Sequence, residues 1–318
     1  MAIDSNSNTA FIEAQQYSQF ILDNLHDGML PDNFYRDVSD FGSGTTLNIK
    51  TIGDAQIQEV SENTPIVYSP IETGNVQLTI TDFIGDAWYV TETMREDGAQ
   101  IEQLLASRGK EATRAIQENF ETRALEVLNA AQTNADPNTI NGFAHRIASA
   151  ETNNIFAIDH LVAMRLAFNK AEIPMGGRIG IVDPIVEATI NSSFTITNAS
   201  LDSNPTNQMI RESGMDRDHS FVINLMGWDI MTSNRLPVGA WDDGTTTLPA
   251  TAVANIFMCI ADDNCKPLMA AWRRKPSVKG EHNKDLDRDE FVQRARFGLG
   301  AQRVDTIGVI ATSGLLYA

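Results

Sequence analysis

The chain has 318 residues, of which 42% are hydrophobic, and its mean hydropathy of −0.21 is typical of a soluble globular protein with one elaborate or two simple domains. Its net charge of −18 argues against sequence-reading DNA binding, because an acidic surface gains nothing from releasing the counterions of phosphates. No apolar run reaches the roughly 18 residues that a membrane helix needs, and two cysteines, Cys259 and Cys265, do not suggest the disulfide framework of a secreted protein.

The N-terminal region predicts one amphipathic helix over residues 10–26. Its apolar residues recur at the spacing of a helical face: Phe11, Ala14, Tyr17, Ile21 and Leu25. Gly28 and Pro31 end the element. The residues before it contain neither the basic nor the apolar segment of a secretory signal.

From Gly44 the pattern alternates between apolar and polar residues, which predicts two strands, one around residues 47–50 and one around 76–81. Residues 53–75 between them are too many for an ordinary hairpin turn and indicate a two-stranded excursion from the body of the protein. Its tip is unexpectedly apolar, at Ile57, Val60, Ile66, Val67 and Tyr68. Exposed apolar groups mark interaction surfaces, so these five residues are predicted to contact another subunit.

A long amphipathic stretch over residues 96–132 predicts a spine helix. Asp97 and Gln100 have the spacing of a capping box at its start, residues 134–137 end it, and Gly109 is a possible break. Six apolar residues on one face are expected to pack against the rest of the chain: Leu104, Leu105, Ile116, Phe120, Val127 and Leu128. An ordinary long bundle helix would show the same stripe.

The second half of the chain mixes helix and strand signals. Residues 155–170 predict a helix, residues 179–182 a buried strand closed by Asp183 and Pro184, and residues 191–219 a polar surface excursion. Strands are expected over 221–231, with a kink at Gly227, and over 252–261, 290–303 and 306–312. The basic run 273–275 with Lys279 suggests a solvated loop or a donor of ion pairs to another subunit, in preference to a phosphate-binding patch.

No constellation of catalytic, cofactor-binding or metal-binding residues emerges. The glycine pairs lack the spacing and the following helix that cradle a phosphate. The histidines, His26, His145, His160, His219 and His282, are scattered. Residues 285–289 have the alternating carboxylates that open a calcium loop, but Glu290 replaces the required glycine and Arg296 the bidentate glutamate. The chain is therefore predicted not to be an enzyme.

Three stretches in order resemble one family. They are residues 76–92 leading into the spine, residues 171–184, and residues 227–237 together with the strand 295–304. From about residue 10 to the C-terminus, the chain resembles the major capsid protein of tailed bacteriophages, with the Hong Kong 97-like fold. The matching motif positions are Pro174, Arg178, Pro184, Gly227, Asn234 and Pro237.

The resemblance implies an α+β fold in five parts. These are an N-terminal arm (1–44), an extended loop (45–92), a peripheral domain with the spine helix (93–150), an axial domain (151–265) and a return to the peripheral domain (266–318). In this family the extended loop lies across a neighbouring subunit.

The family also implies a function. Its members self-assemble into hexamers and pentamers of an icosahedral head that encloses double-stranded DNA, contacted non-specifically. They assemble in the host cytoplasm, end in the virion, and have a portal and in some cases a decoration protein as partners. Neither a cofactor nor a membrane is implied. Because the spine begins near residue 98 and the arm is short, a scaffolding protein is expected to be a separate chain.

One departure concerns covalent cross-linking. Some members cross-link through a lysine in the extended loop, whereas residues 53–75 contain none and Lys50 lies on the strand leading to them. We therefore expect non-covalent assembly. An encapsulin-type nanocompartment shell has the same fold and is the alternative; a soluble metal-dependent enzyme using His and Asp groups is a third class.

Overall fold

The computed structural model describes residues 30, 32–40, 44–53, 57–63, 65–68, 70–98, 101–132, 138–197, 221–242 and 246–314. The helix predicted over residues 10–26 lies outside this part of the chain. The described residues group into two compact units. One holds those of 86–115 and 278–293, and the other holds those of 27–85, 116–277 and 294–318.

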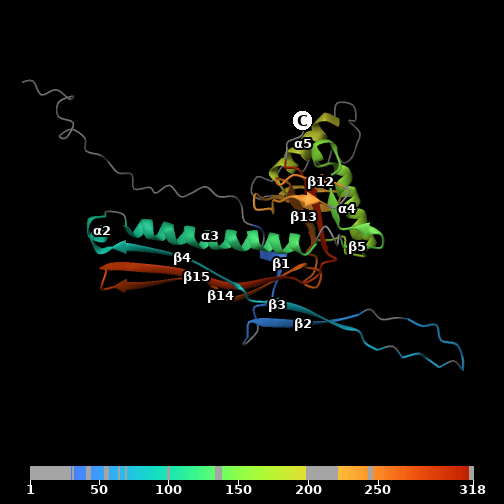
Figure 1. The fold of residues 1–318 in the computed structure, drawn as a ribbon, viewed down its shortest axis with the longest axis horizontal. Helices are drawn as coiled ribbons and strands as arrows, with labels where there is room; N and C mark the ends of the chain where they lie inside the picture. Colours follow the sequence, from blue (N-terminus) through green and yellow to red (C-terminus); the bar gives the residue numbers. More distant parts are fainter. Residues whose placement is uncertain are drawn as a thin grey trace, which may run out of the picture. The chain divides into compact units, whose positions relative to one another are not determined.

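Helices and strands are mixed along the chain (Figure 1), so the predicted α+β class is confirmed. The helices are α2 (Glu92–Asp97), α3 (Ile101–Ala130), α4 (Ile158–Lys170) and α5 (Pro184–Thr197), with short 3-10 turns at Asp32–Phe34 and Thr152–Asn154. The strands are β1 (Tyr35–Asp37), β2 (Thr46–Ile52), β3 (Thr73–Thr79), β4 (Asp82–Thr91), β5 (Thr139–Ile140), β6 (Phe143–Ala144), β7 (Arg146–Ala148), β8 (Arg178–Val182), β9 (Phe221–Leu225), β10 (Trp228–Thr232), β11 (Trp241–Asp242), β12 (Thr247–Leu248), β13 (Val253–Cys259), β14 (Leu268–Asn283), β15 (Arg288–Ala301) and β16 (Ile307–Thr312). Among the described helices, none combines the length and the apolar character of a membrane span.

The predicted spine helix is present as α3, a single helix of 30 residues. The expected capping box is wrong, because Asp97 is the last residue of the separate helix α2. The chain breaks at Gly98, which is extended (φ −90°, ψ 115°), and α3 continues through Gly109. A glycine inside a helix costs only about 1 kcal/mol, which the surrounding turns of a long helix tolerate.

A six-stranded sheet in the order β7-β16-β13-β8-β10-β9 forms the main core of the larger unit. Alternate residues of β13 point to opposite faces. Ile256 and Met258 join a cluster with Phe120, Leu125 and other residues of α3, whereas Phe257 and Cys259 join a cluster with α4 and α5. Both faces of the sheet are thus covered by helices, which explains why β13 is buried throughout.

Three elements differ from the sequence-based expectations. Residues 184–197 form helix α5, although the chain from 191 was expected to be a surface excursion. The Asp183 side chain caps this helix by accepting a 3.0 Å hydrogen bond from the Ile185 N–H, and Pro184 suits its first turn. Residues 198–220 lie outside the described part. The expected kink at Gly227 is instead a tight turn between antiparallel β9 and β10, with Met226 and Gly227 at φ +52° and +82°.

The third difference is β14, a 16-residue strand in the four-stranded sheet β1-β14-β15-β4. The basic run 273–275 lies within this strand, so its interpretation as a loop is wrong. Consecutive charged residues and Pro276 hide the strand in the sequence, because such residues are uncommon in strands. The first four residues of the strand, from Leu268 to Ala271, are all buried.

Candidate functional site

The hairpin β2–β3 carries the predicted extended loop. Its strands pair antiparallel from Thr46 opposite Thr79 to Ile52 opposite Thr73. One further backbone bond, 2.8 Å from the Gly53 N–H to the Glu72 carbonyl, extends the pairing. Figure 1 shows the loop running beyond the hairpin as a long excursion. The two strands predicted from the alternating pattern are therefore present.

Inside the loop, one side chain replaces backbone pairing. The Gln58 Nε2 donates to the Val67 carbonyl at 2.6 Å, and the Val67 N–H donates to the Gln58 Oε1 at 3.2 Å. A side-chain amide offers the donor and acceptor of a peptide group, so Gln58 joins the two branches of the loop as a strand residue would.

The apolar side chains of the loop are exposed. Ile57 is 98% exposed and Tyr68 is 92% exposed, and Val60, Ile66 and Val67 are also open to solvent. Two further residues that the sequence analysis did not single out, Ile52 and Ile71, are equally exposed. Ile52 ends β2 and Ile71 lies two residues before β3. In the sequence they look like ordinary apolar residues of a strand and not like part of the loop. Nothing in the described part of the chain covers this apolar surface.

The base of the hairpin is fixed to the subunit. Leu78 and Ile80 are buried against Met269 and Ala271 of β14, with Leu47, Ile49 and Val76 packed around them. Gly298 of β15 allows this contact, because a Cβ there would lie 2.5 Å from the Thr79 carbonyl oxygen. A rigid base thus presents a long loop that has few contacts of its own.

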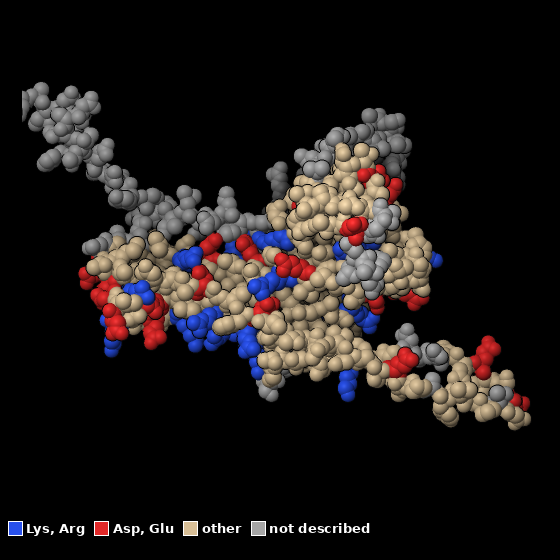
Figure 2. Space-filling model, in the orientation of Figure 1, with Lys and Arg blue, Asp and Glu red and all other residues tan. Residues whose placement is uncertain are grey.

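The loop also carries negative charge. The sequence has no Lys, Arg or His between Lys50 and Arg95, and the loop residues Glu59, Glu62 and Glu72 are exposed. Figure 2 shows acidic side chains on the described part of the loop among residues of neither charge. The surface offered to a partner therefore combines apolar and acidic groups.

The residues predicted to pack on the spine helix lie at different depths. Ile116, Phe120 and Leu128 are buried, and Leu105 and Val127 are half-buried. Leu104 is 45% exposed, which differs from the expectation. Leu104 precedes Leu105 by one residue and therefore lies to one side of the row formed by Ile101, Leu105 and Ala112, which faces the core.

An ionic cluster fixes the middle of α3. Arg235 donates to the Glu121 carboxylate at 3.0 Å and to Glu118 at 3.1 Å, and the Leu30 N–H donates to Glu121 at 2.7 Å. Burial raises the pKa of Glu121, against the opposing effects of the Leu30 N–H and the Arg235 guanidinium. This cluster is not visible in the sequence, because Arg235 is more than a hundred residues from its partners Glu118 and Glu121 on α3.

The motif positions serve the fold. Arg178 donates to the carbonyls of Pro174 (2.8 Å) and Ile173 (2.6 Å) and lies over the rings of Phe168 and Trp228. The other positions lie at chain reversals or strand ends: Pro184 opens α5, Gly227 forms the β9–β10 turn, Asn234 follows β10, and the Pro237 carbonyl accepts from the Ala254 N–H. These residues shape the subunit core, and the exposed loop is a separate feature.

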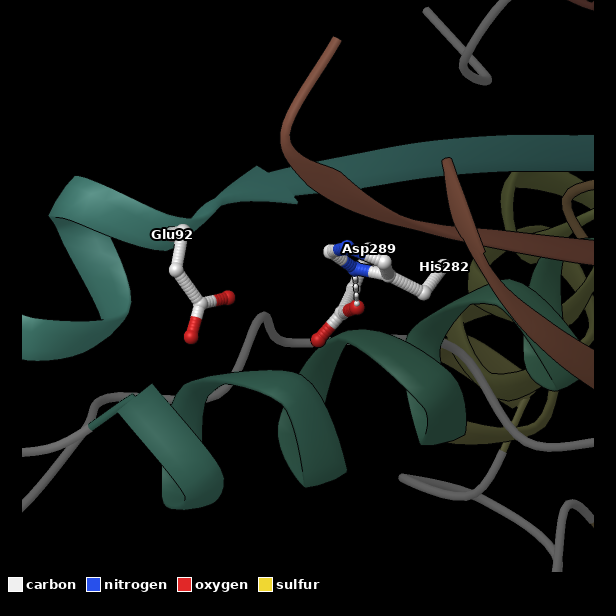
Figure 3. Close-up of side chains that lie close together, drawn as sticks. All are labelled: Glu92, His282 and Asp289. Atoms are coloured by element: carbon white, nitrogen blue, oxygen red, sulfur yellow. Dashed lines mark hydrogen bonds and ion pairs between the residues drawn. The ribbon is translucent and has the colours of Figure 1, made fainter. Parts of the chain in front are cut away.

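Three side chains of types that can bind a metal lie close together where the tip of the β14–β15 hairpin approaches the end of β4. The donor atoms of Glu92, His282 and Asp289 lie within 4.8 Å of one another (Figure 3). However, Asp289 Oδ1 lies 2.8 Å from the His282 Nδ1, and its Oδ2 accepts from Arg95 at 2.7 Å. Because the carboxylate already has two partners, one of them a guanidinium, this group is a surface ion-pair network and no metal is assigned to it.

The buried titratable groups have structural partners. The Cys259 thiol lies near the Pro174 and Gly176 carbonyls, and burial raises its pKa, which disfavours the reactive thiolate. His145 is fully buried, and its Nδ1 donates to the Asn138 carbonyl at 2.9 Å. A second thiol, that of Cys265, lies beside Cys259 and also raises its pKa.

Comparison with known proteins gives a consistent result. A family model described as phage capsid protein matches residues 74–312. The solved mature capsid of bacteriophage PhiM1 is 12% identical with a TM-score of 0.69, covering 96% of this chain and 93% of that chain. Mycobacterium phage Che8 (14% identical, TM-score 0.65, 94% and 97% covered) and the Cyanophage Pam1 capsid (15%, 0.64, 99% and 99%) are also similar. No curated protein matches the sequence.

At these identities the similarity shows the fold. It extends over nearly the whole chain and over nearly the whole of each matched capsid chain. The predicted Hong Kong 97-like capsid fold is therefore confirmed.

Proposed function

We propose, from the premise that this chain belongs to the phage capsid protein family, that it is the major coat subunit whose copies form the hexamers and pentamers of an icosahedral head. The observation that carries this proposal is the extended loop, whose apolar side chains are exposed and are not covered by the described part of the chain. A hairpin is marginally stable alone in water, so a long exposed one is best explained by a neighbour that buries it.

The five loop residues predicted from sequence, Ile57, Val60, Ile66, Val67 and Tyr68, are the proposed contacts with that neighbour, and Ile52 and Ile71 extend the set. The assignment of residues 45–92 to this loop, of 93–150 and 266–318 to a peripheral domain and of 151–265 to an axial domain belongs to the same proposal. So does the absence of a lysine-mediated cross-link, since the loop residues 53–75 contain no lysine.

Polar substitutions in the loop test the proposal. Ile57→Ser with Tyr68→Ser should leave the folded subunit intact, because both side chains are exposed in it, and should reduce the assembled fraction by about tenfold or more. Sedimentation measures the assembled fraction, and circular dichroism checks the fold. Val162→Ser with Leu166→Ser, at two partly exposed apolar residues of α4, is the control. Equal assembly of the two variants would contradict the proposed role of the loop.

The contents of the particle are a further part of the proposal. A phage head encloses double-stranded DNA, whereas a nanocompartment shell of the same fold encloses an enzyme. Nuclease-protected DNA in particles purified from their natural source is the expected result. Particles that contain a stoichiometric enzyme and no protected DNA would support the nanocompartment. A scaffolding protein, a portal and a decoration protein are proposed partners, and host cytoplasm is the proposed place of assembly.

A further inference from the structure

Two thiols lie together at one end of the strand β13. Cys259 is the last residue of this strand and is completely buried, whereas Cys265 is partly exposed, and both are free thiols. The chain turns back between them: the Cys265 N–H donates to the Asp262 carbonyl at 2.9 Å, and the Lys266 N–H donates to the same oxygen at 3.1 Å. Cys265 therefore returns to the apolar cluster that contains Cys259.

The two sulfurs interact with each other inside this cluster. Burial is the main cause that raises the pKa of Cys259, and the Cys265 thiol raises it further through its charge and through a hydrogen bond. A hydrogen bond is a short-range contact, so the two sulfurs lie side by side. The turn between the two residues and their shared apolar cluster account for this proximity.

The surroundings of Cys259 lose little when its thiol hydrogen is removed. The sulfur lies 3.8 Å from the Pro174 carbonyl oxygen and 3.7 Å from the Gly176 carbonyl oxygen. A thiol is a weak hydrogen-bond donor, and the Pro174 carbonyl also accepts a 2.8 Å hydrogen bond from the Arg178 Nε. Converting the Cys259 thiol to a disulfide therefore removes only weak hydrogen bonds.

We propose that Cys259 and Cys265 form a redox modification site, at which a peroxide closes a disulfide within one chain. The partly exposed Cys265 thiolate attacks one oxygen of hydrogen peroxide, the O–O bond breaks, and Cys265 becomes a sulfenic acid as hydroxide leaves and takes up the thiol proton. The Cys259 sulfur then attacks the Cys265 sulfur, the S–O bond breaks, and water leaves with the Cys259 proton. The two thiols together lose two electrons, and one peroxide is reduced to two waters.

The disulfide restrains the turn that follows β13. The Ile260 N–H donates to the Gly177 carbonyl at 2.7 Å, and Gly177 packs so closely that a Cβ there would lie 2.8 Å from the Ala261 Cα. Opening of this turn therefore also breaks its contact with the segment before β8. Because the disulfide closes only a short loop, it restricts this local opening more than it restricts unfolding of the whole chain.

Mass spectrometry of the full chain tests the inference. After exposure to hydrogen peroxide and alkylation of the remaining thiols, the tryptic peptide that contains both cysteines should lack two hydrogen atoms and carry no alkyl group. Dithiothreitol should reverse the change. Amide hydrogen exchange of residues 260–266 should slow by about tenfold upon oxidation, because the closed loop opens less often.

Cys265→Ser is the control variant. Its remaining thiol, that of Cys259, is buried, so it should stay reduced in peroxide, and the hydrogen exchange of the turn should not change. Cys259→Ser should instead leave Cys265 as a sulfenic acid that a dimedone probe labels, because the second sulfur is missing.

Other outcomes would overturn the inference. A peptide that gains oxygen atoms and keeps one alkylated thiol would show that oxidised Cys265 does not reach Cys259. A disulfide-linked dimer on a non-reducing gel would show that Cys265 reacts with a second copy instead. Thiols that both stay reduced in excess peroxide would contradict the site altogether. None of these results bears on self-assembly, because the inference is independent of the proposed function.

Discussion

Arg178 shows how a buried cation can hold one part of the fold in place. Its guanidinium donates hydrogen bonds to two backbone carbonyls of the segment before β8 and so fixes that segment. It also lies over two aromatic rings. Burial lowers its pKa, against the attraction of the Cys259 sulfur. The residue stands out in the sequence as part of the motif 171–184, but its partners are visible only in the structure.

We predict that Arg178→Met destabilises the subunit by about 3 kcal/mol, because it leaves buried carbonyls without donors while retaining similar volume. Urea unfolding of the unassembled subunit measures the change. Arg303→Met, at an exposed position, should cost less than about 0.5 kcal/mol. Equal effects of the two variants would show that the contacts of Arg178 contribute nothing.

His145 makes stability depend on pH. Burial lowers its pKa below the ordinary 6.5, although the Asn138 carbonyl and Asp305 act in the opposite direction. Its Nδ1–H is bonded, and its buried Nε2 has no partner among the described residues, so a second proton would lack an acceptor. The unfolded chain therefore binds a proton more readily than the folded one.

The direction of the pH dependence follows from the difference in proton binding between the folded and unfolded chain. A base with a lowered folded pKa contributes stability above its unfolded pKa and loses it as the pH falls below about 6.5. For one proton, the slope cannot exceed about 1.4 kcal/mol per pH unit. We predict that the unfolding free energy of the wild type, measured by urea denaturation, falls between pH 7.5 and 5 more than that of His145→Gln. Parallel curves would contradict this role for His145.

At the scale of the element, α3 is held by an aromatic cluster. The Phe120 ring stacks on Trp272 with centroids 4.8 Å apart and meets the edges of Phe297 and Tyr35. All four rings belong to one unit, and the cluster joins the helix to strands β1, β14 and β15. The amphipathic stripe of the helix predicts that Phe120 is buried but not which strands cover it.

Truncating this ring should be costly. Phe120→Ala is predicted to destabilise the subunit by about 3–5 kcal/mol, because it removes a buried ring from a close-packed cluster. Leu104→Ala on the same helix, at a half-exposed position, should cost less than about 1 kcal/mol. Thermal and urea unfolding of both variants provide the measurement. A larger loss of stability for Leu104→Ala than for Phe120→Ala would contradict the assignment of the Phe120 side as the buried face of α3.

Elements with a clear period could be predicted from the sequence, and those without one could not. The spine, the β2–β3 strands, α4, β8, β13, β15 and β16 follow their apolar patterns. The strand β14 was missed because its exposed half is basic, and α5 because Asp183 and Pro184 suit the end of a strand as well as the start of a helix.

At the scale of the whole molecule, the proposed function requires repeated contacts between copies of the chain. Each copy presents one long loop with an apolar and acidic surface. In the proposed shell, many modest interfaces per subunit reinforce one another, so that no covalent link is required. The central claim is therefore self-assembly.

The most direct test is electron microscopy of the wild-type chain expressed alone, with analytical sedimentation of the same sample. The account predicts closed uniform shells or capsomer rings that sediment far above the 34.9 kDa chain. A protein that remains a monomer or dimer across a wide range of salt and protein concentration would contradict it.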